Sequence, residues 1–176
     1  MSEKNISIDE FHIPRWNELP NVDLYLDQIV TLINKTLSPF IFFNNNSEKE
    51  DSQLLTKTMI NNYVKNNLIT PPEKKLYSKK QVAKLFVICV LKQVYSMHEI
   101  DTLIKIALQD ASIADTYDDF CNLFEDALRC AFGEKDFIDK SCNNDKIHLI
   151  KTTLLSCSYK IYVQNTITAN QNEELQ

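Results

Sequence analysis

Residues 55–69 have the sequence Leu55-Thr-Lys-Thr-Met-Ile-Asn-Asn-Tyr-Val-Lys-Asn-Asn-Leu-Ile69, which predicts a short amphipathic helix followed by a turn. Successive side chains of a helix are rotated by about 100°. The apolar side chains then gather on one side, and they are Met59, Ile60, Tyr63, Val64 and Leu68. The opposite half of the helix carries only Lys, Thr and Asn, which are the residue types that bind phosphates and base edges.

The polar face of this helix contains no acidic residue, so we predict that it contacts DNA. Asn and Thr side chains suit base edges and Lys suits phosphates, and the candidates are Lys57, Thr58, Asn61, Asn62 and Lys65. The predicted recognition helix spans residues 56–67, with Asn67 in the left-handed conformation that ends many helices. Tyr63 shares the phase of Ile60 and Val64, so core packing is favoured for it over stacking on a base.

A basic segment, Pro71-Pro-Glu-Lys-Lys-Leu-Tyr77, follows the helix. We predict a small β hairpin, or wing, at residues 68–76. Lys74 and Lys75 would bind the flanking phosphates. The alternative is that they are only the solvated tip of a loop.

The net charge of −5 does not by itself suggest a nucleic-acid-binding protein. Residues 52–93, however, hold eight lysines and one acid, Glu73, and so carry +7 while the remainder carries −12. This asymmetry favours one basic surface on an acidic body. A solvated, lysine-rich helix face is the alternative.

The composition favours an all-α fold with one small β wing. Among 176 residues there is one glycine and there are five prolines, too few for a turn-rich β-sandwich or barrel. We expect an N-terminal arm at residues 1–20, a winged helix-turn-helix domain at residues 21–110 with an insertion at 38–52, and a helical dimerisation segment at residues 111–176.

Local signals place further helices along the chain. A helix from Asn21 or Asp23 should run to about residue 37. Two capping-box patterns, Ser78-Lys-Lys-Gln81 and Ser96-Met-His-Glu99, open the next two helices. Another helix is expected at residues 117–132, with its acidic residues in its first turn or on a solvated face. Residues 165–176 are polar and are expected to fray.

The last long helix repeats apolar residues at spacings of three and four, which is the pattern of a coiled-coil or bundle helix. These residues are Ile147, Ile150, Leu154, Cys157 and Ile161. Folding back on the protein's own helices is the commoner fate of such a seam, but we expect partial use in a homodimer, because two-fold DNA sites favour two-fold proteins.

Enzyme motifs are lacking, so we expect neither catalysis nor a cofactor. The chain contains no phosphate-binding glycine loop, nucleophile elbow or paired-histidine metal helix. The combination of Cys142 with His148 and Cys157 suits a metal or a thiol sensor, but ordinary packing is the favoured interpretation. The five cysteines, the absence of a signal segment and the absence of a membrane span favour a reducing, cytoplasmic setting.

The order of these features resembles the winged helix-turn-helix of the mercury-resistance regulator family. The matching features are a helix that begins at Thr56 and carries Tyr63, the Asn67-Leu-Ile69 ending, the basic segment at residues 71–76, Tyr77-Ser78, and the capped Ser96-Met-His-Glu-Ile100. This resemblance covers about 50 residues, and it implies DNA binding and pairing of two copies through a helix placed after the winged domain.

A closer similarity is to the bacterial family called domain of unknown function 1836. It rests on Trp16, Leu24-Tyr-Leu-Asp-Gln28, Leu55 to Lys65, Tyr77-Ser78 and Leu91-Lys-Gln93. That family implies no activity. The functional prediction is therefore a sequence-specific regulator of transcription that binds double-stranded DNA as a homodimer. The alternative is a helical module that uses the same scaffold to bind an acidic protein.

Overall fold

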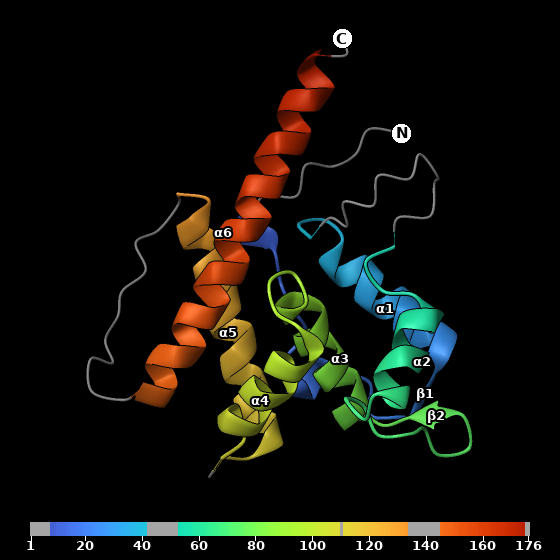
Figure 1. Ribbon diagram of the computed structural model, residues 1–176. Coiled ribbons are helices and arrows are strands. Elements are labelled where there is room, and N and C mark those ends of the chain that lie inside the picture. The colour runs from blue at the N-terminus through green and yellow to red at the C-terminus, as the bar shows by residue number, and fades with distance from the viewer. Residues whose placement is uncertain (1–7, 42–52, 110, 134–144, 175–176) are drawn as a thin grey trace.

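The computed structural model describes residues 8–41, 53–109, 111–133 and 145–174 of the chain, and helices dominate this part (Figure 1). The helices are α1 Leu26–Leu37, α2 Lys57–Lys65, α3 Lys79–Leu91, α4 Met97–Ala107, α5 Ile113–Ala131 and α6 Asp145–Glu174, with 3-10 turns η1 Ile8–Glu10 and η2 Trp16–Glu18. Strands β1 Leu24–Tyr25 and β2 Leu76–Tyr77 form an antiparallel pair. The prediction of an all-α protein is confirmed.

The predicted starts of α2 and α4 are confirmed by side-chain caps. The Thr56 hydroxyl accepts a hydrogen bond from the Met59 amide at 3.2 Å, which satisfies one of the free amides in the first turn of α2. At α4 the Ser96 amide donates to the Glu99 carboxylate at 2.7 Å, and the Glu99 amide donates to the Ser96 hydroxyl at 3.4 Å. These reciprocal bonds are the capping box expected from the sequence.

The end of α2 is set by Asn67, as predicted. Asn67 has φ 57°, in the left-handed region. This conformation lets the Leu68 amide donate to the Tyr63 carbonyl at 2.9 Å and the Asn67 amide donate to the Val64 carbonyl at 3.0 Å. The two bonds form a Schellman motif, which satisfies the last carbonyls of the helix and turns the chain toward the wing.

Three helix bounds differ from the predictions. The first helix begins at Leu26, because Leu24–Tyr25 is a strand and the Gln28 side chain caps the Tyr25 amide. Helix α5 begins at Ile113, before the predicted residue 117, because Ser112 caps it. Helix α6 continues to Glu174 where fraying was expected.

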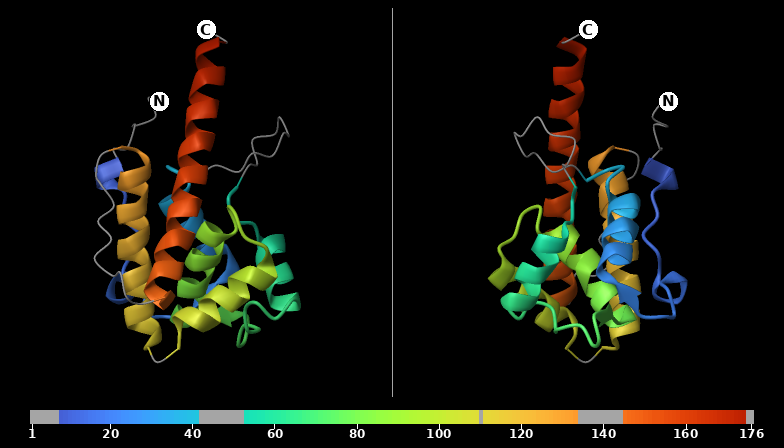
Figure 2. Two further views of the ribbon diagram at one scale, coloured as in Figure 1. Left: turned by 60° about the vertical axis from the view of Figure 1, so that its left-hand side comes forward. Right: turned by 90° about the vertical axis from the view of Figure 1, so that its right-hand side faces the viewer.

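The buried core is built around α3 and along the contact between α5 and α6, which run side by side (Figure 2). Leu85, Phe86, Ile88 and Val90 of α3 are fully buried, as the apolar sequence of this helix predicts. Buried residues from the N-terminal arm, the predicted winged domain and the C-terminal helices belong to one continuous cluster.

The N-terminal arm is held on α5 by a buried ion pair that the sequence did not indicate. The Arg15 guanidinium binds both carboxylate oxygens of Glu125, at 2.6 and 2.7 Å, and Glu125 is only 5% exposed. The same carboxylate accepts a hydrogen bond from the Ile13 amide at 2.9 Å. The prediction that Glu125 belongs to a solvated face is therefore wrong.

Candidate nucleic-acid interface

Helix α2 presents its polar face outward. Its inner residues Ile60 and Tyr63 are buried at 0% and 3% exposure. The predicted contacts are all exposed, and they are Lys57, Thr58, Asn61, Asn62 and Lys65. The placement of Tyr63 in the core follows from the same helical phase. Exposure is the condition for reading DNA, and α2 meets it along its whole polar face.

Helix α2 is fixed to α1 by a clamp of two hydrogen bonds. The side chain of Asn34 on α1 donates to the Leu55 carbonyl at 2.8 Å and accepts from the Leu55 amide at 2.9 Å. This pairing holds the backbone just before the Thr56 cap, so α1 orients the start of α2. Residues 42–52 of the predicted insertion lie outside the described part of the chain.

The turn of the predicted wing is shorter than expected. The Glu73 amide donates to the Leu76 carbonyl at 3.0 Å, and the Leu76 amide donates to the Glu73 carbonyl at 2.8 Å. Lys74 and Lys75 lie between them with φ of 48° and 69°. Two successive left-handed residues define a tight hairpin turn that normally uses Asn and Gly. Two lysines are thus held, fully exposed, in a conformation that lysine disfavours.

Apart from the Glu73–Leu76 pair that closes the turn, the strand after it does not pair within the predicted hairpin of residues 68–76. Leu76 and Tyr77 of β2 instead face Tyr25 and Leu24 of β1, which precedes α1. Before the turn, the chain is held by Gln81 of α3, whose side-chain amide donates to the Thr70 carbonyl at 2.8 Å. The root of the turn is therefore anchored to α1 through β1 and to α3 through Gln81.

The lysines of the basic segment differ in how they are held. Lys57 forms an exposed ion pair with Asp27 of α1. Lys79 donates to Asn21 at 2.7 Å and lies 5.2 Å from the Trp16 ring centroid. Within the described residues, no acid lies in ion-pair range of the three lysines that flank the polar face of α2, which are Lys65, Lys74 and Lys75.

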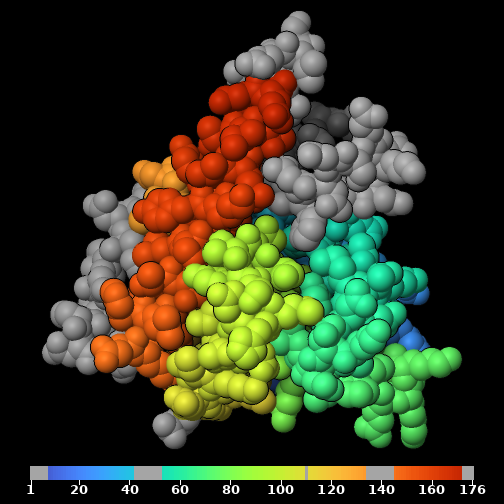
Figure 3. All heavy atoms as spheres, viewed as in Figure 1, coloured from blue at the N-terminus to red at the C-terminus, as the bar shows by residue number. Residues whose placement is uncertain are grey.

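Figure 3 shows α2 (teal) and the segment after it (green) next to each other on one face of the molecule. On this face, α4 lies between these two segments and α6. The candidate surface is therefore continuous from the polar face of α2 to the turn at Lys74 and Lys75. In the sequence these two parts are separated by the Schellman turn and the two prolines.

The predicted dimer residues of α6 are largely used inside the protomer. Leu154, Cys157 and Ile161 are at most 1% exposed, and α5 is the main partner of α6. Ile150 is half-buried and Ile147 is 37% exposed. The seam therefore folds back on the protein's own helices, the commoner fate of one amphipathic helix, and leaves little of itself for a second copy.

Cys89, Cys121 and Cys157 are buried as core residues are, whereas Cys130 is half-buried. Burial raises the pKa of the Cys89, Cys121 and Cys157 thiols to about 12. His148, which was weighed with Cys157 as a metal ligand, is exposed on α6. Cys142 lies outside the described residues. None of the helices traced here combines the length and apolarity that a membrane span requires.

One comparison with known proteins identifies a family. The model of the family described as Domain of unknown function (DUF1836) matches residues 14–120, which run from the N-terminal arm into α5. No curated protein and no solved structure matches the chain. Because the matched region covers more than half of the 176 residues, the chain belongs to the family of domain of unknown function 1836.

Proposed function

We propose that this protein is a sequence-specific regulator of transcription that binds double-stranded DNA through a winged helix-turn-helix. The observation that carries the proposal is the exposed, acid-free face of α2 beside the strained turn at Lys74 and Lys75. Helix α2 has nine residues, a length of about 14 Å at 1.5 Å per residue. The diameter of an α-helix with its side chains is about 10–12 Å, so such a helix fits the major groove of B-DNA, which is about 12 Å wide.

Each exposed side chain has a role that follows from its chemistry. Asn61 and Asn62 would bind base edges, since an Asn amide can pair with adenine through two hydrogen bonds. Lys65, Lys74 and Lys75 would bind phosphates, which fixes the register without reading sequence. Lys57 can exchange Asp27 for a phosphate at little cost, because an exposed ion pair contributes little to stability.

The backbone strain at the turn supports a role in binding. A non-glycine residue in the left-handed region costs roughly 1 kcal/mol or more. Two successive lysines in this conformation are expected where the strained turn helps to bind a ligand. A phosphate backbone is a ligand that two adjacent ammonium groups at the tip of a rigid turn would bind.

We infer that two copies bind one DNA site, since a single winged domain buries too little DNA surface for tight specificity. Three exposed apolar residues of α6, Tyr159, Val163 and Ile167, are spaced by four residues and lie along one side of the helix. Figures 1 and 2 show the C-terminal end of α6 extending beyond the body of the protein. The row formed by Tyr159, Val163 and Ile167 is the surface on which we place the dimer contact.

The test is selection of bound fragments from genomic DNA, followed by fluorescence anisotropy on the preferred site. We expect Asn61→Ala and Asn62→Ala to cost about 1–3 kcal/mol each on that site and to relax specificity at one base pair. Lys74→Ala should weaken binding to all sequences alike and lower the salt dependence by about one ion.

The matched control is Asn17→Ala in the arm, an exposed position away from α2, which should leave binding unchanged. The proposal is wrong if Asn61→Ala and Asn62→Ala, both folded, keep the affinity and specificity of the unmodified protein. Binding to an acidic protein without any preference among DNA sequences would favour the interaction module instead.

A further inference from the structure

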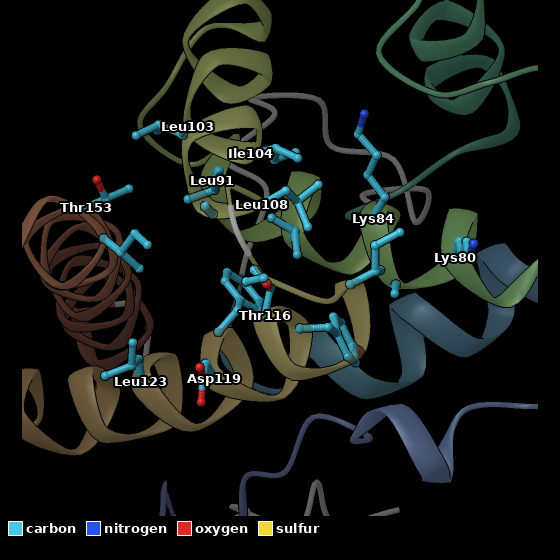
Figure 4. A pocket seen from close by; sticks show the side chains of 18 of the residues that line it. Lys80, Lys84, Leu91, Leu103, Ile104, Leu108, Thr116, Asp119, Leu123 and Thr153 are labelled. Atoms are coloured by element: carbon cyan, nitrogen blue, oxygen red, sulfur yellow. The ribbon is translucent and has the colours of Figure 1, made fainter. Parts of the chain in front are cut away.

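A cavity of about 830 Å³ lies between α3, α4, α5 and α6, apart from the polar face of α2 (Figure 4). Its wall is mainly apolar, and the side chains that Figure 4 labels there include Leu91, Leu103, Ile104, Leu108 and Leu123. Small-molecule sites in proteins usually have volumes of about 300–1,000 Å³ and mainly apolar walls. The cavity has the size and character of a ligand site.

The apolar wall is incompletely covered by the protein itself. Leu103, Ile104 and Leu108 of α4 and Leu123 of α5 are only half-buried, although they lie on the inner sides of their helices. Covering such apolar side chains removes them from water and so stabilises whatever complex covers them. A ligand with an apolar body would therefore gain free energy by filling this space.

The edge of the cavity formed by α3 is cationic. Lys80 and Lys84 are four residues apart and so lie on the same side of α3, and both line the cavity. Lys84 is half-buried, and burial lowers the pKa of its ammonium, an effect opposed by Asp101 and reinforced by Lys105. Asp101 is itself paired with Lys105 at 2.5 Å. No ion pair of Lys84 occurs within the described ranges.

Other polar groups of the wall do not neutralise this edge. Figure 4 shows Thr116 and Asp119 on α5 and Thr153 on α6, across the cavity from Lys80 and Lys84. Asp119 is exposed, so water screens its charge. Lys146, at the start of α6, adds a further cation to the wall and donates to the Gln109 carbonyl at 2.5 Å. The described residues that line this largely apolar space thus include three cations, Lys80, Lys84 and Lys146, and one acid, Asp119.

We propose that this cavity binds an amphipathic small molecule with an apolar chain or ring and one anionic group, such as a carboxylate. The apolar part lies among the leucines of α3, α4 and α5, and the anionic group is bound by Lys84 and Lys80. The Lys84 ammonium is partly desolvated and the nearby Asp101 is paired with Lys105, so a ligand carboxylate would stabilise the ammonium further through a charge-assisted hydrogen bond. Binding at this site does not depend on whether the protein binds DNA.

The test uses three probes of equal chain length and the full-length protein without DNA. Decanoate, decan-1-ol and decyltrimethylammonium are titrated in a calorimeter below the concentrations at which they form micelles. We expect decanoate to bind at one site per chain and about tenfold more tightly than the alcohol, because one charge-assisted hydrogen bond is worth about that factor. The cation should bind more weakly than the alcohol.

Two variants locate the site. Lys84→Gln should weaken decanoate binding about tenfold and leave decan-1-ol binding unchanged, whereas Lys160→Gln on α6 should change neither. Leu108→Trp should fill the cavity and reduce the binding of both probes, with circular dichroism used to confirm that it folds. If Leu108→Trp unfolds, the decanoate affinity of Lys84→Gln alone decides whether the cavity is the binding site.

Three results would overturn the proposal. They are the absence of saturable binding by any probe, equal affinity for all three probes, and unchanged decanoate affinity in the Lys84→Gln variant. Because no DNA is present, each of these results is independent of the proposed regulatory function. Failure of the DNA-binding test would equally leave the ligand measurement unaffected.

Discussion

At the scale of single residues, substitutions of Lys75 distinguish effects on the stability of the protein from effects on the proposed DNA binding. Its φ of 69° places it at the second position of a tight turn where Gly is preferred. Lys75→Gly should raise the free energy of unfolding by about 0.5–1 kcal/mol, because it relieves the left-handed strain. The same change should weaken DNA binding, since it removes a phosphate contact.

Lys75→Ala is the matched control for this prediction. It removes the ammonium and keeps the strained backbone, so it should weaken DNA binding as much as Lys75→Gly without raising stability. Urea denaturation and anisotropy measure the two properties on the same samples. Equal stability of the Gly and Ala variants would show that the turn is not strained.

Arg15 provides a second prediction at this scale. Arg15→Met leaves the buried Glu125 carboxylate without its bidentate partner, and removing one partner of such a pair costs about 3–5 kcal/mol. We expect a loss near the lower value, because Arg129 lies 3.9 Å from the same carboxylate. Urea denaturation measures the loss.

Two further variants show whether burial is the cause. The double variant Arg15→Met/Glu125→Met should recover most of the lost stability, since no unpaired charge stays buried. Lys57→Met, which breaks an exposed pair with Asp27, should cost less than about 1 kcal/mol. Similar losses for Arg15→Met and Lys57→Met would contradict this account of the arm.

At the scale of elements, the cap of α4 predicts a dependence of stability on pH. The hydrogen bonds from the Ser96 side chain and backbone lower the pKa of Glu99 from its usual 4.5. A carboxylate whose pKa is lower in the folded state contributes stability above its unfolded pKa, and this contribution is lost as the pH falls through the folded value. Glu99→Gln keeps an acceptor at this position but removes the charge.

The urea midpoint of Glu99→Gln should therefore lie below that of the unmodified protein at neutral pH. The two midpoints should converge as the pH falls below about 4.5. Asp145→Asn, at the first residue of α6, is a control for loss of an acidic charge near a helix start. A difference for Glu99→Gln that stays constant from neutral to acidic pH would exclude the charged cap as its cause.

Helix α3 is the element that connects the other parts. Its buried residues form the centre of the core, Gln81 at its start holds the Thr70 carbonyl before the turn, and Lys84 lines the cavity. One rigid helix thus contacts both candidate sites. Its apolar sequence predicts burial, but only the packing of four helices around it creates the cavity.

At the scale of the whole molecule, a buried and an exposed position of α6 are expected to differ when a carboxylate is introduced. Leu154→Asp places a carboxylate in the core and should unfold the protomer, because an isolated buried charge is strongly unfavourable. Val163 is 48% exposed and belongs to the row formed with Tyr159 and Ile167. Val163→Asp should therefore leave folding intact and dissociate the dimer.

Light scattering at micromolar concentration, with circular dichroism on the same samples, measures both effects. The unmodified protein should have about twice the 20.5 kDa mass of one chain, and Val163→Asp should have the mass of one chain. Thr152→Asp, also exposed on α6 but about two turns before Tyr159, is the control for added negative charge. A mass near 20.5 kDa for the unmodified protein would make the dimer prediction wrong.

The sequence by itself determined the helices and the face that each presents. Thr56 and Ser96 cap their helices, Asn67 ends α2, and the polar half of α2 faces outward, because these features depend on residues within one or two turns of each other. The predicted DNA contacts were therefore placed correctly on the surface from local pattern alone. Their role in binding stays a prediction.

Only the tertiary structure decided which distant segments meet. Two-residue strands have no sequence pattern long enough to reveal that Leu24–Tyr25 pairs with Leu76–Tyr77. Arg15 and Glu125 are 110 residues apart, so neither identifies the other in the sequence. The apolar seam of α6 was compatible with a partner copy or with the chain's own core. Burial against α5 settled it, because the hydrophobic effect depends on area removed from water and not on which chain removes it.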